Sequence, residues 1–365
     1  MTTAPFMREA LDLAHQCIGA TEPNPRVGCV IVAADGARVL GRGSTQAAGQ
    51  AHAEVMALRD AAMQGNDVRG ATVYVTLEPC AHHGRTPPCC DSLIAAGVGK
   101  VIASVADPNP LVAGQGFEKL RAARIAVESG PGEDEARELN IGFFSRMQRK
   151  LPWVRMKVAA SLDGKTALEN GASQWITSPE ARKDGHAWRA RASAVLTGIG
   201  TVLEDNPRLD VRDVPTARQP FAVIVDSKLE TPPGAAMFID SRPLVLYTSR
   251  PDAGRRSALE SRGATVVEMP NPDGKVDLAA MLRDLARREV NELHVEAGHK
   301  LNGSLLREGL VDELLVYLAP KLLGHGRDMA SLGPFSQLDE ALPLHLHSVT
   351  QVGPDIRVIA RVIRP

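Results

Sequence analysis

The chain has 365 residues, with 42 Lys and Arg against 43 Asp and Glu and a formal net charge of −1. A hydrophobic content of 44% and a charged content of 23% are typical of a folded globular protein and exclude a disordered or fibrous chain. The balanced charge argues against nucleic-acid binding and favours a small-molecule substrate. No uncharged apolar run approaches about 18 residues, and the N-terminus lacks a signal-peptide pattern, so we expect a cytoplasmic protein without a membrane span.

Length and residue usage both predict two domains. The chain is longer than one domain usually is. All five Cys lie in the first 90 residues, whereas all three Trp lie after residue 150. An odd number of Cys in a chain without a recognisable leader argues against a disulfide framework and favours a metal site or catalysis. We therefore predict one domain over residues 1–149 and a different domain over residues 150–365.

The first half alternates between predicted helices and strands. Apolar residues recur at helical spacing over residues 6–18, and a β-branched run at residues 27–32 predicts a buried strand. The other predicted elements of this half are helices at 53–63, 91–96 and 132–148 and strands at 71–76 and 100–105. Strands that alternate with helices predict a layered α/β architecture.

The second half alternates in the same way. Its predicted helices cover residues 179–191, 254–262, 278–288 and 301–308. Its predicted strands cover residues 154–159, 194–196, 221–226, 244–248, 265–268, 292–296 and 314–318. Residues 356–363 predict a last strand, which we expect at the edge of the sheet. This half is therefore also predicted to be an α/β domain.

A His, a Glu and several Cys of the first half form a metal-site pattern. His52 and Glu54 stand at the start of a predicted helix, Cys80 follows a strand, and Cys89 and Cys90 begin the next helix. One His and two thiolates, with a nearby Glu that is not a ligand, are typical of zinc deaminases, in which zinc keeps one position for water. Glu54 would then move the proton of that water. The alternatives are a closed structural zinc site or a Cys pair in the core.

The loop between the candidate thiols is longer than the pattern requires. Eight residues (AHHGRTPP) separate Cys80 from Cys89 instead of two, and spacing alone does not choose between Cys89 and Cys90 as the ligand. His83 and Arg85 in this loop suit recognition of an anionic substrate group. A solvated loop without a binding role is an equally good interpretation.

Two glycine-containing segments of the second half follow predicted strands, at residues 197–201 and 298–304. Glycines there allow backbone N–H groups to approach an anion at the start of a helix. Neither segment matches the dinucleotide-binding fingerprint, so tight turns explain each of them equally well. Two such segments at strand ends favour a cofactor cleft, and Arg250 could hold a 2′-phosphate there.

Longer motifs carry a more specific resemblance. The first half contains PNPRVGCVIV, HAEVMAL, YVTLEPCAHHGRTPPC and DPNPLVAGQG, and the second contains KVAASLDGKTA, SQWITSPEAR, VLTGIGTVLEDNP, HVEAGHKLNGSLL and VDELLVYLAPKLLG. Together they resemble the bifunctional riboflavin-biosynthesis family RibD, a pyrimidine deaminase joined to a reductase, over nearly the whole chain. The resemblance implies a cytidine-deaminase-like α/β/α zinc domain followed by a dihydrofolate-reductase-like α/β domain.

The resemblance also implies roles for individual residues. In the first half it implies one Zn²⁺ held by His52, Cys80 and Cys89, a proton shuttle at Glu54 and a pyrimidine contact at Asn24, which by itself suggests only a turn. In the second half it implies NADPH contacts at Ala159, Trp175, Thr201, Asp205, Ser227, Gly298, His299, Lys300, Leu301, Asn302, Gly303 and Ser304. It implies substrate contacts at Ser173, Arg189, Leu209, Arg212 and Glu296. Asp205 or Glu296 could assist proton transfer.

The implied substrate is a phosphorylated pyrimidine, 2,5-diamino-6-ribosylamino-4(3H)-pyrimidinone 5′-phosphate. The first half would release its 2-amino group as ammonia. The second half would use NADPH to reduce the ribosyl group, which gives 5-amino-6-ribitylaminouracil 5′-phosphate. One position departs from the family pattern, since Thr45 stands where the family commonly has a His. Arg42 or His83 is the candidate for the part of that His.

Two other functions share part of this pattern. A nucleobase deaminase that acts on RNA shares the zinc and Glu chemistry, but not the near-zero charge or the eight-residue spacing of the thiols. A non-enzymatic, zinc-stabilised binding module would have no use for Glu54. We expect the bifunctional enzyme instead, assembled as a homo-oligomer.

Overall fold

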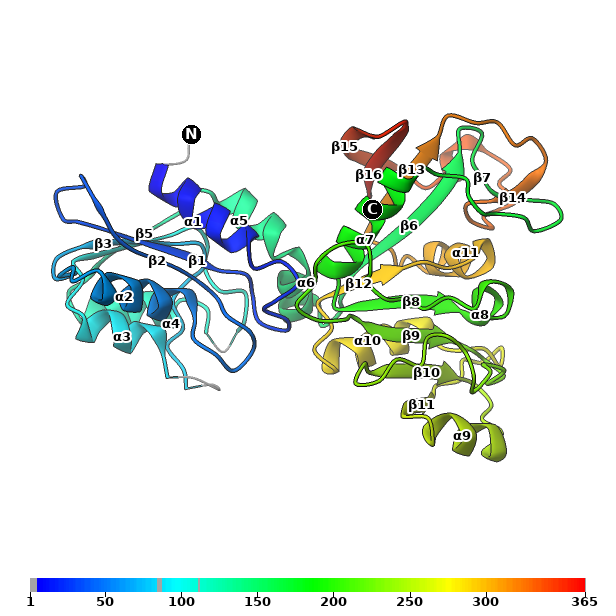
Figure 1. Cartoon of the computed structure of the whole chain (residues 1–365), viewed down its shortest axis with the longest axis horizontal. Helices are drawn as coiled ribbons and strands as arrows, with labels where there is room; N and C mark the ends of the chain where they lie inside the picture. The colour runs from blue at the N-terminus through cyan, green and yellow to red at the C-terminus, as the bar shows by residue number, and fades with distance from the viewer. Residues whose placement is uncertain (1–4, 84–86, 111, 365) are drawn as a thin grey trace. The chain divides into compact units, whose positions relative to one another are not determined.

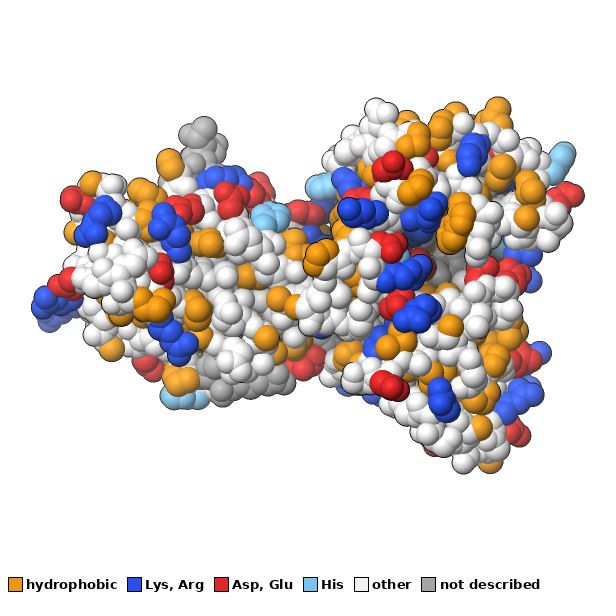
Figure 2. Space-filling model, viewed as in Figure 1, with side chains coloured by type: hydrophobic (Ala, Val, Ile, Leu, Met, Phe, Trp, Pro, Cys, Tyr) orange, Lys and Arg blue, Asp and Glu red, His pale blue; other side chains and the backbone are white. Residues whose placement is uncertain are grey.

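Figure 1 shows the computed structural model of the chain, which describes residues 5–83, 87–110 and 112–364. The chain forms two compact units, residues 1–150 and 151–365, and each has a hydrophobic core of its own. On the face drawn in Figure 2, basic and acidic side chains are interspersed over both units. Within the described part of the chain, no helix is long and apolar enough to cross a membrane.

The first unit is built on one sheet. Its helices in the described part are α1 (Pro5–His15), α2 (Ala53–Met63), α3 (Cys89–Ala95), α4 (Gln115–Ala122), α5 (Glu133–Leu139) and α6 (Ile141–Arg149). Its strands are β1 (Gly28–Val32), β2 (Val39–Ser44), β3 (Thr72–Val75), β4 (Lys100–Ala103) and β5 (Ala126–Ser129). The strand order is β2-β1-β3-β4-β5, in which β1 runs antiparallel to both neighbours and β3, β4 and β5 run parallel.

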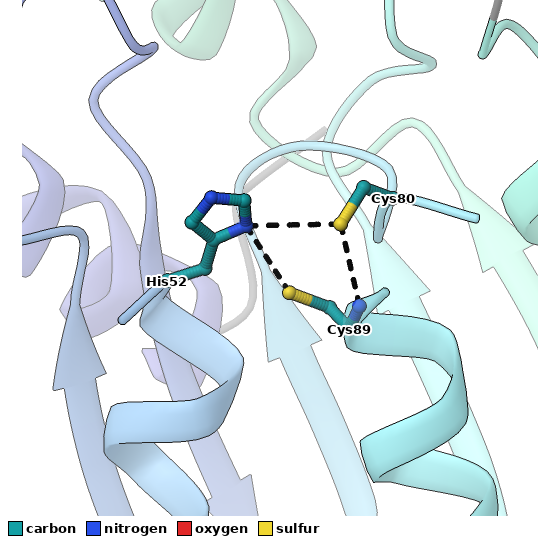
Figure 3. A group of neighbouring side chains, drawn as sticks. All are labelled: His52, Cys80 and Cys89. Carbon is teal, nitrogen blue, oxygen red and sulfur yellow. Dashed lines mark hydrogen bonds between the residues drawn. The ribbon is translucent and has the colours of Figure 1, made fainter. Parts of the chain in front are cut away.

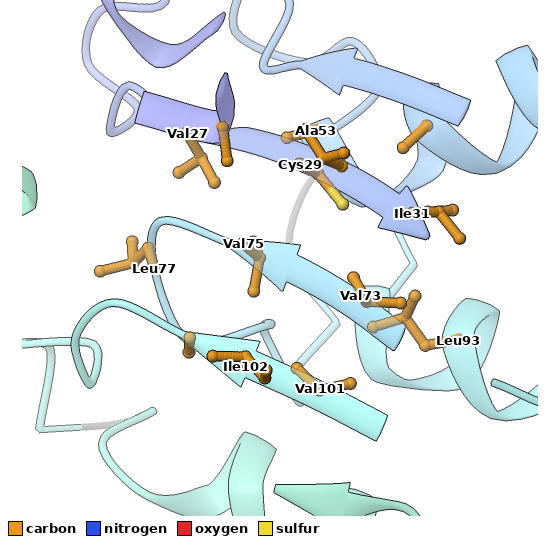
Figure 4. Packing of buried hydrophobic residues seen from close by; sticks show 14 of the residues in the cluster. Val27, Cys29, Ile31, Ala53, Val73, Val75, Leu77, Leu93, Val101 and Ile102 are labelled. Atoms are coloured by element: carbon orange, nitrogen blue, oxygen red, sulfur yellow. The ribbon is translucent and has the colours of Figure 1, made fainter. Parts of the chain in front are cut away.

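Helices cover both faces of this sheet. α1 and α5 lie on one face, and α2, α3 and α4 lie on the other (Figure 1). Strand β1 is therefore buried along its whole length. Figure 4 shows Val73 and Val75 of β3 beside Val101 of β4 and Leu93 of α3 in the core. This arrangement confirms the predicted α/β/α layers.

The directions of the strands bring the predicted metal ligands to one edge of the sheet. Since β1 is antiparallel to β2 and β3, its first residues lie beside their carboxyl ends, with Gly28 opposite Ser44 and Cys29 opposite Val75. Strands β3 and β4 are parallel, so the carboxyl end of β4 lies at the same edge. The chain leaves this edge toward His52 after β2 and toward Cys80 after β3.

Strand β2 is absent from the predicted elements because Gly41 and Gly43 interrupt its apolar alternation. A Cβ atom at either position would lie 2.3 Å from a backbone oxygen of α2, that of Ala57 for Gly41 and that of Ala53 for Gly43. The two glycines thus allow α2 to lie directly on β2. This contact fixes the first turn of α2, where Glu54 stands.

The single helix predicted at residues 132–148 is wrong, because α5 ends at Leu139 and α6 begins at Ile141. Asn140 between them donates a hydrogen bond to the Arg26 carbonyl (2.9 Å) and accepts one from the Arg26 backbone N–H (2.8 Å). The Asn140 side chain pairs with the backbone of a distant segment, and the spacing of apolar residues carries no sign of such a contact.

The second unit is larger. Its helices in the described part are α7 (Pro179–Arg191), α8 (Ile199–Asp205), α9 (Ala253–Glu260), α10 (Leu278–Arg287), α11 (His299–Arg307) and the 3₁₀ turn η1 (Leu338–Glu340). Its strands are β6 (Trp153–Ser161), β7 (Lys165–Leu168), β8 (Ala194–Gly198), β9 (Phe221–Val225), β10 (Leu244–Thr248), β11 (Ala264–Glu268), β12 (Glu292–Val295), β13 (Glu313–Ala319), β14 (Gly326–Asp328), β15 (Leu344–Val352) and β16 (Asp355–Val362).

Nine of these strands form one sheet in the order β11-β10-β9-β8-β12-β6-β13-β16-β15, and β14 pairs with β7. The seven strands from β11 to β13 are parallel, and β16 is antiparallel to β13 and β15. The predicted edge position of the C-terminal strand is wrong, because β16 lies between β13 and β15. Strand β15 forms the edge; a register shift between Leu346 and Ser348 breaks the alternation that would have predicted it.

Parallel pairing also positions the second candidate site. Strands β8 and β12 are parallel neighbours, so their carboxyl ends lie side by side at the same end of the strands. Helix α8 begins directly after β8, and α11 begins after the short segment that follows β12. The two glycine-containing segments of the sequence therefore lie side by side, as the hypothesis of a cofactor cleft requires.

Candidate functional site

Three side chains from different elements meet at the edge of the first sheet (Figure 3). His52 stands directly before α2, Cys80 lies in the turn after β3, and Cys89 is the first residue of α3. Their possible ligand atoms all lie within 4.8 Å of one another. His52 Nδ1 is 3.7 Å from the Cys80 Sγ and 3.3 Å from the Cys89 Sγ.

These separations fit a metal ion of the size of zinc. Zinc binds His nitrogen at about 2.0–2.1 Å and Cys sulfur at about 2.3 Å in tetrahedral geometry, which places a bound nitrogen and a bound sulfur about 3.5 Å apart. The two observed distances lie on either side of that value. Three ligands leave a fourth position for a water molecule, as in catalytic zinc sites.

Cys90 points away from this cluster. Its thiol donates hydrogen bonds to the carbonyl oxygens of Pro79 (3.2 Å) and Gly116 (3.6 Å), and the residue is fully buried. The spacing in the sequence left Cys89 and Cys90 open as ligands, whereas the structure brings only Cys89 to His52 and Cys80.

The thiols of Cys80 and Cys89 differ in their pKa. Hydrogen bonds from Cys89 and His52 outweigh the effect of burial and lower the pKa of Cys80 to about 4. The hydrogen bond with Cys80, together with burial, raises the pKa of Cys89. The hydrogen bond with Cys80 also raises the pKa of His52. Of the two thiols, that of Cys80 therefore loses its proton more readily, and a metal ion binds the deprotonated form of each thiol.

Glu54 lies beside the cluster in the first turn of α2 and is 4% exposed. Burial and the negative charge of Cys80 raise the pKa of Glu54 to about 7. A carboxyl group with a pKa near neutrality can both take up and release a proton, as a proton shuttle must.

The other residues predicted for this site occupy varied positions. Asn24 is half-buried in a turn whose backbone N–H donates to the Thr21 carbonyl (2.9 Å). His83 is exposed, and Arg85 lies outside the described residues. Thr45 is buried, and its N–H donates to the Val27 carbonyl (2.9 Å).

Arg42, one candidate for the role of the family His at position 45, lies on β2 and pairs with Glu9 of α1. Its neighbours Gly41 and Gly43 face α2, and α1 and α2 lie on opposite faces of the sheet. The guanidinium is therefore already paired on the α1 face, which leaves His83 as the other candidate.

The second unit contains a cavity of about 280 Å³ where β6, β8 and β12 end. Seven of the residues predicted to contact the cofactor line it, namely Ala159, Trp175, Thr201, Asp205, Gly298, His299 and Asn302. Ser173 and Glu296 from the predicted substrate set line it too. The structure thus brings together residues that are up to 143 positions apart, between Ala159 and Asn302.

The other predicted cofactor residues do not line the cavity. Lys300, Leu301, Gly303 and Ser304 belong to α11, where a Cβ atom at Gly303 would lie 2.2 Å from the Ser331 carbonyl oxygen. Gly303 therefore serves close packing of the helix. Ser227 follows β9, and its Oγ accepts a hydrogen bond from the Val276 N–H (3.2 Å).

Three predicted substrate residues also lie outside the cavity lining. Arg189 donates to both oxygens of Glu296, at 2.8 Å from Nη2 to Oε2, and to the Asp210 carbonyl at 2.9 Å. Arg212 pairs with the Asp210 carboxylate at 2.8 Å. Leu209 is buried, and its backbone has a positive φ of 53°.

The Arg189 contact sets the charge of Glu296. Burial alone would raise the pKa of Glu296, but the charge and hydrogen bonds of Arg189 outweigh it and hold the pKa well below its usual range. Lys157 lies 4.0 Å from Glu296 and lines the cavity, and its burial lowers its pKa. Glu296 is therefore a fixed negative charge at the cavity wall.

Two charged residues of the KVAASLDGKTA motif have clear contacts. Lys157 faces the cavity beside Glu296. Asp163 accepts hydrogen bonds from the Leu323 N–H (3.1 Å) and the Gly324 N–H (2.8 Å), so it fixes the loop after β13. The SLDGK motif that contains Asp163 was the signal that could have found it.

Comparison with known proteins covers both units. The family model described as "RibD C-terminal domain" matches residues 152–358. The model described as "Cytidine and deoxycytidylate deaminase zinc-binding region" matches residues 2–105. The first match alone spans more than half of the chain.

Full-length relatives share this two-part organisation. The chain is 45% identical to the riboflavin biosynthesis protein RibD of Escherichia coli (strain K12), over 96% of this chain and 97% of that protein. It is 41% identical to RibD of Aquifex aeolicus, over 96% of each. A structure of Acinetobacter baumannii RibD superposes with a TM-score of 0.89 at 41% identity, over 98% of both chains.

A Thermotoga maritima structure gives a TM-score of 0.85 at 35% identity, again over 98% of both chains. These matches confirm the predicted fold class and the predicted pair of activities. Neither an RNA deaminase alone nor a binding module accounts for similarity that extends through both halves. The chain therefore belongs to the RibD family, the bifunctional deaminase–reductases of riboflavin biosynthesis.

Proposed function

We propose that residues 1–149 carry the deaminase and residues 150–365 the reductase, a division supported by the two compact units. The Thermotoga maritima relative is named a diaminohydroxyphosphoribosylaminopyrimidine deaminase and 5-amino-6-(5-phosphoribosylamino)uracil reductase. By that likeness, the substrate of this chain is 2,5-diamino-6-ribosylamino-4(3H)-pyrimidinone 5′-phosphate. The deaminase releases its 2-amino group, and the reductase then converts the ribosyl group to ribityl.

The observation that carries the deaminase proposal is the meeting of His52, Cys80 and Cys89 beside the buried Glu54. The first three would hold one Zn²⁺. When bound, zinc supplies the Lewis acidity that makes water a nucleophile at neutral pH. Glu54 takes the proton of the attacking water and delivers it to the ring nitrogen and then to the leaving amine. Asn24, His83 and Arg85 are the proposed substrate contacts of this half.

The cavity of the second unit supports NADPH as the reductase cofactor. Proposed contacts are Ala159, Trp175, Thr201, Asp205, Ser227 and residues 298–304, of which seven line the cavity. When bound, NADPH would supply a hydride, and the resemblance implies C1′ of the ring-opened ribosyl group as the atom that accepts it. Arg250 lies against Gly274 beside the Ser227 turn, where its permanent charge suits the 2′-phosphate that distinguishes NADPH from NADH.

The proposed reductase substrate contacts are Ser173, Arg189, Leu209, Arg212 and Glu296. Arg189 and Arg212 are the phosphate partners, because their guanidinium groups are always charged and can bind bidentately. Between the two candidates for the proton donor, we favour Asp205. Burial raises the pKa of Asp205, whereas Arg189 holds the pKa of Glu296 well below its usual range.

We also propose a homo-oligomer. Strand β15 is the open edge of a nine-stranded sheet, and apolar side chains along it are exposed, among them Leu346 and Val349. An open edge with exposed apolar residues favours pairing with another chain.

A paired assay tests the proposed function. The wild-type chain should release ammonia from the diaminopyrimidinone ribosylamine 5′-phosphate and oxidise NADPH once that product has formed. Glu54→Gln should keep zinc and reductase activity while ammonia release falls by roughly 10²–10⁴-fold, because the proton shuttle is lost. Ammonia release at the wild-type rate from Glu54→Gln would contradict the role of Glu54. A wild-type chain that shows neither activity would overturn the assignment.

A further inference from the structure

Glu78 is a buried carboxylate that the proposed chemistry does not use. It follows β3, stands two residues before Cys80 and is 3% exposed. Its two oxygens accept hydrogen bonds from four backbone N–H groups, those of Asp107 (3.1 Å), Gly114 (3.0 Å), Gly116 (2.9 Å) and Phe117 (3.3 Å). One side chain therefore ties the turn of Cys80 to the segment after β4 and to the start of α4.

Close packing also holds this junction. A Cβ atom at Gly116 would lie 2.1 Å from the Pro79 carbonyl oxygen. The Cys90 thiol donates to the carbonyl oxygens of Pro79 (3.2 Å) and Gly116 (3.6 Å). The start of α4 thus contacts the turn that carries Cys80 and the helix that begins with Cys89.

The segment held by Glu78 lies beside the metal centre. It leaves the carboxyl end of β4, which is at the same edge of the sheet as the Cys80 turn. The two segments also pair through their backbones, because the Glu78 N–H donates a hydrogen bond to the Val105 carbonyl oxygen (2.9 Å). Asp107 in turn accepts the Asn109 N–H (2.8 Å), which orders the segment further.

We propose that Glu78 is a positioning residue of the deaminase half: its carboxylate holds the segment after β4 against the Cys80 turn as a substrate-facing wall of the site. The inference rests on the proposed deaminase site. Four N–H donors need two oxygens that only accept, which a carboxylate offers and an amide does not. A Gln at this position would turn an NH₂ group toward two of the four donors. The wall would then move while the metal ligands stay in place.

The experiment compares Glu78→Gln with Glu118→Gln, which makes the same chemical change at an exposed carboxyl group in the first turn of α4. Zinc content, amide hydrogen exchange and both activities are measured on the full chain. For Glu78→Gln we expect full zinc content, wild-type reductase activity and faster exchange of the Asp107, Gly114 and Gly116 amides. The KM for ammonia release should rise roughly tenfold or more, with kcat changed less than KM, because a misplaced wall weakens substrate positioning. Glu118→Gln should match the wild type.

Two further variants keep the inference testable if Glu78→Gln folds poorly. Glu78→Asp keeps both accepting oxygens, so its KM should lie between those of the wild type and Glu78→Gln. Gly116→Ala pushes the same segment away from Pro79 and should raise KM as Glu78→Gln does. Loss of zinc with an unchanged KM in the remaining holoenzyme, or wild-type KM in Glu78→Gln or Gly116→Ala, would overturn the inference. A wild-type chain without ammonia release would instead contradict the proposed function. Unchanged amide exchange in Glu78→Gln would in either case refute the inference that Glu78 holds the segment after β4 in place.

Discussion

Cys89 and Cys90 are neighbours in the chain, yet their thiols point to different surroundings. Cys89 lies 3.3 Å from the His52 ring, whereas Cys90 hydrogen-bonds the backbone of Pro79. The first turn of a helix separates consecutive side chains by about 100°, so only one of the two can face the cluster. At the scale of single residues, the start of α3 therefore selects Cys89 as the second thiol ligand, after Cys80.

The two thiols provide a matched pair of variants. Cys89→Ser should weaken zinc binding by more than the roughly 10- to 100-fold that loss of an outer-shell partner costs, because a ligand itself is removed. Cys90→Ser should leave zinc affinity close to the wild-type value. Zinc content after dialysis and competition with a chromophoric chelator measure both. Equal losses in the two variants would contradict the ligand set.

The candidate metal ligands were predictable from short motifs, whereas the rest of the site depends on long-range contacts that the sequence does not reveal. His52, Glu54 and Cys80 lie in motifs whose chemistry can be read locally. Glu78 belongs to the same stretch of sequence, but its partners are backbone N–H groups 29 to 39 positions away, which no local pattern reveals. The pairing of Arg189 with Glu296, 107 positions apart, was hidden for the same reason.

Among the elements, those with local signals were predicted best. Helix α7 has the predicted bounds because Ser178 caps it by accepting the Ala181 N–H and Pro179 fits its first turn. Strands β2 and β15 were missed because glycines or a register shift interrupt their alternation. The break between α5 and α6 depends on Asn140 and a distant partner. Local signals thus account for helices such as α2 and α7 and not for elements defined by their neighbours.

The contact between β2 and α2 gives a prediction at this scale. Gly43→Ala would place a Cβ atom 2.3 Å from the Ala53 carbonyl oxygen and the Ala57 nitrogen, so α2 must move. We expect a loss of roughly 1–3 kcal/mol in the free energy of unfolding of the first unit, as for other overpacked sites. Ammonia release should fall as well, because His52 and Glu54 move with α2. Urea unfolding and both activity assays check this.

Gly234→Ala is the control for that variant. Gly234 lies in a turn of the second unit, where an added Cβ would meet no atom within 4 Å. Its free energy of unfolding should stay within roughly 0.5 kcal/mol of the wild type. Stability of Gly43→Ala equal to that of Gly234→Ala would show that α2 has room to accommodate the methyl group.

For the whole molecule, the two compact units with separate cores predict two ligand-specific responses. All three candidate zinc ligands lie in the first unit, and the cavity proposed to bind the cofactor lies in the second. Calorimetry should show that a chelator lowers one thermal transition only. NADPH at about 100 times its Kd should raise the other by roughly 5–10 °C, since such a ligand adds about 2.7 kcal/mol. Shifts of both transitions by either treatment would contradict this independence.

The pairing of Arg189 with Glu296 has a consequence for how the second unit selects its ligand. A carboxylate already occupies the Arg189 guanidinium, so in the proposed role of Arg189 as phosphate partner an arriving phosphate must exchange partners with Glu296. The affinity gained is only the difference between two similar ion pairs. Small anions that lack the rest of the substrate gain little from this exchange, and a ligand that also satisfies the released Glu296 gains most. In that role, the internal ion pair is a competitor that the substrate phosphate must displace.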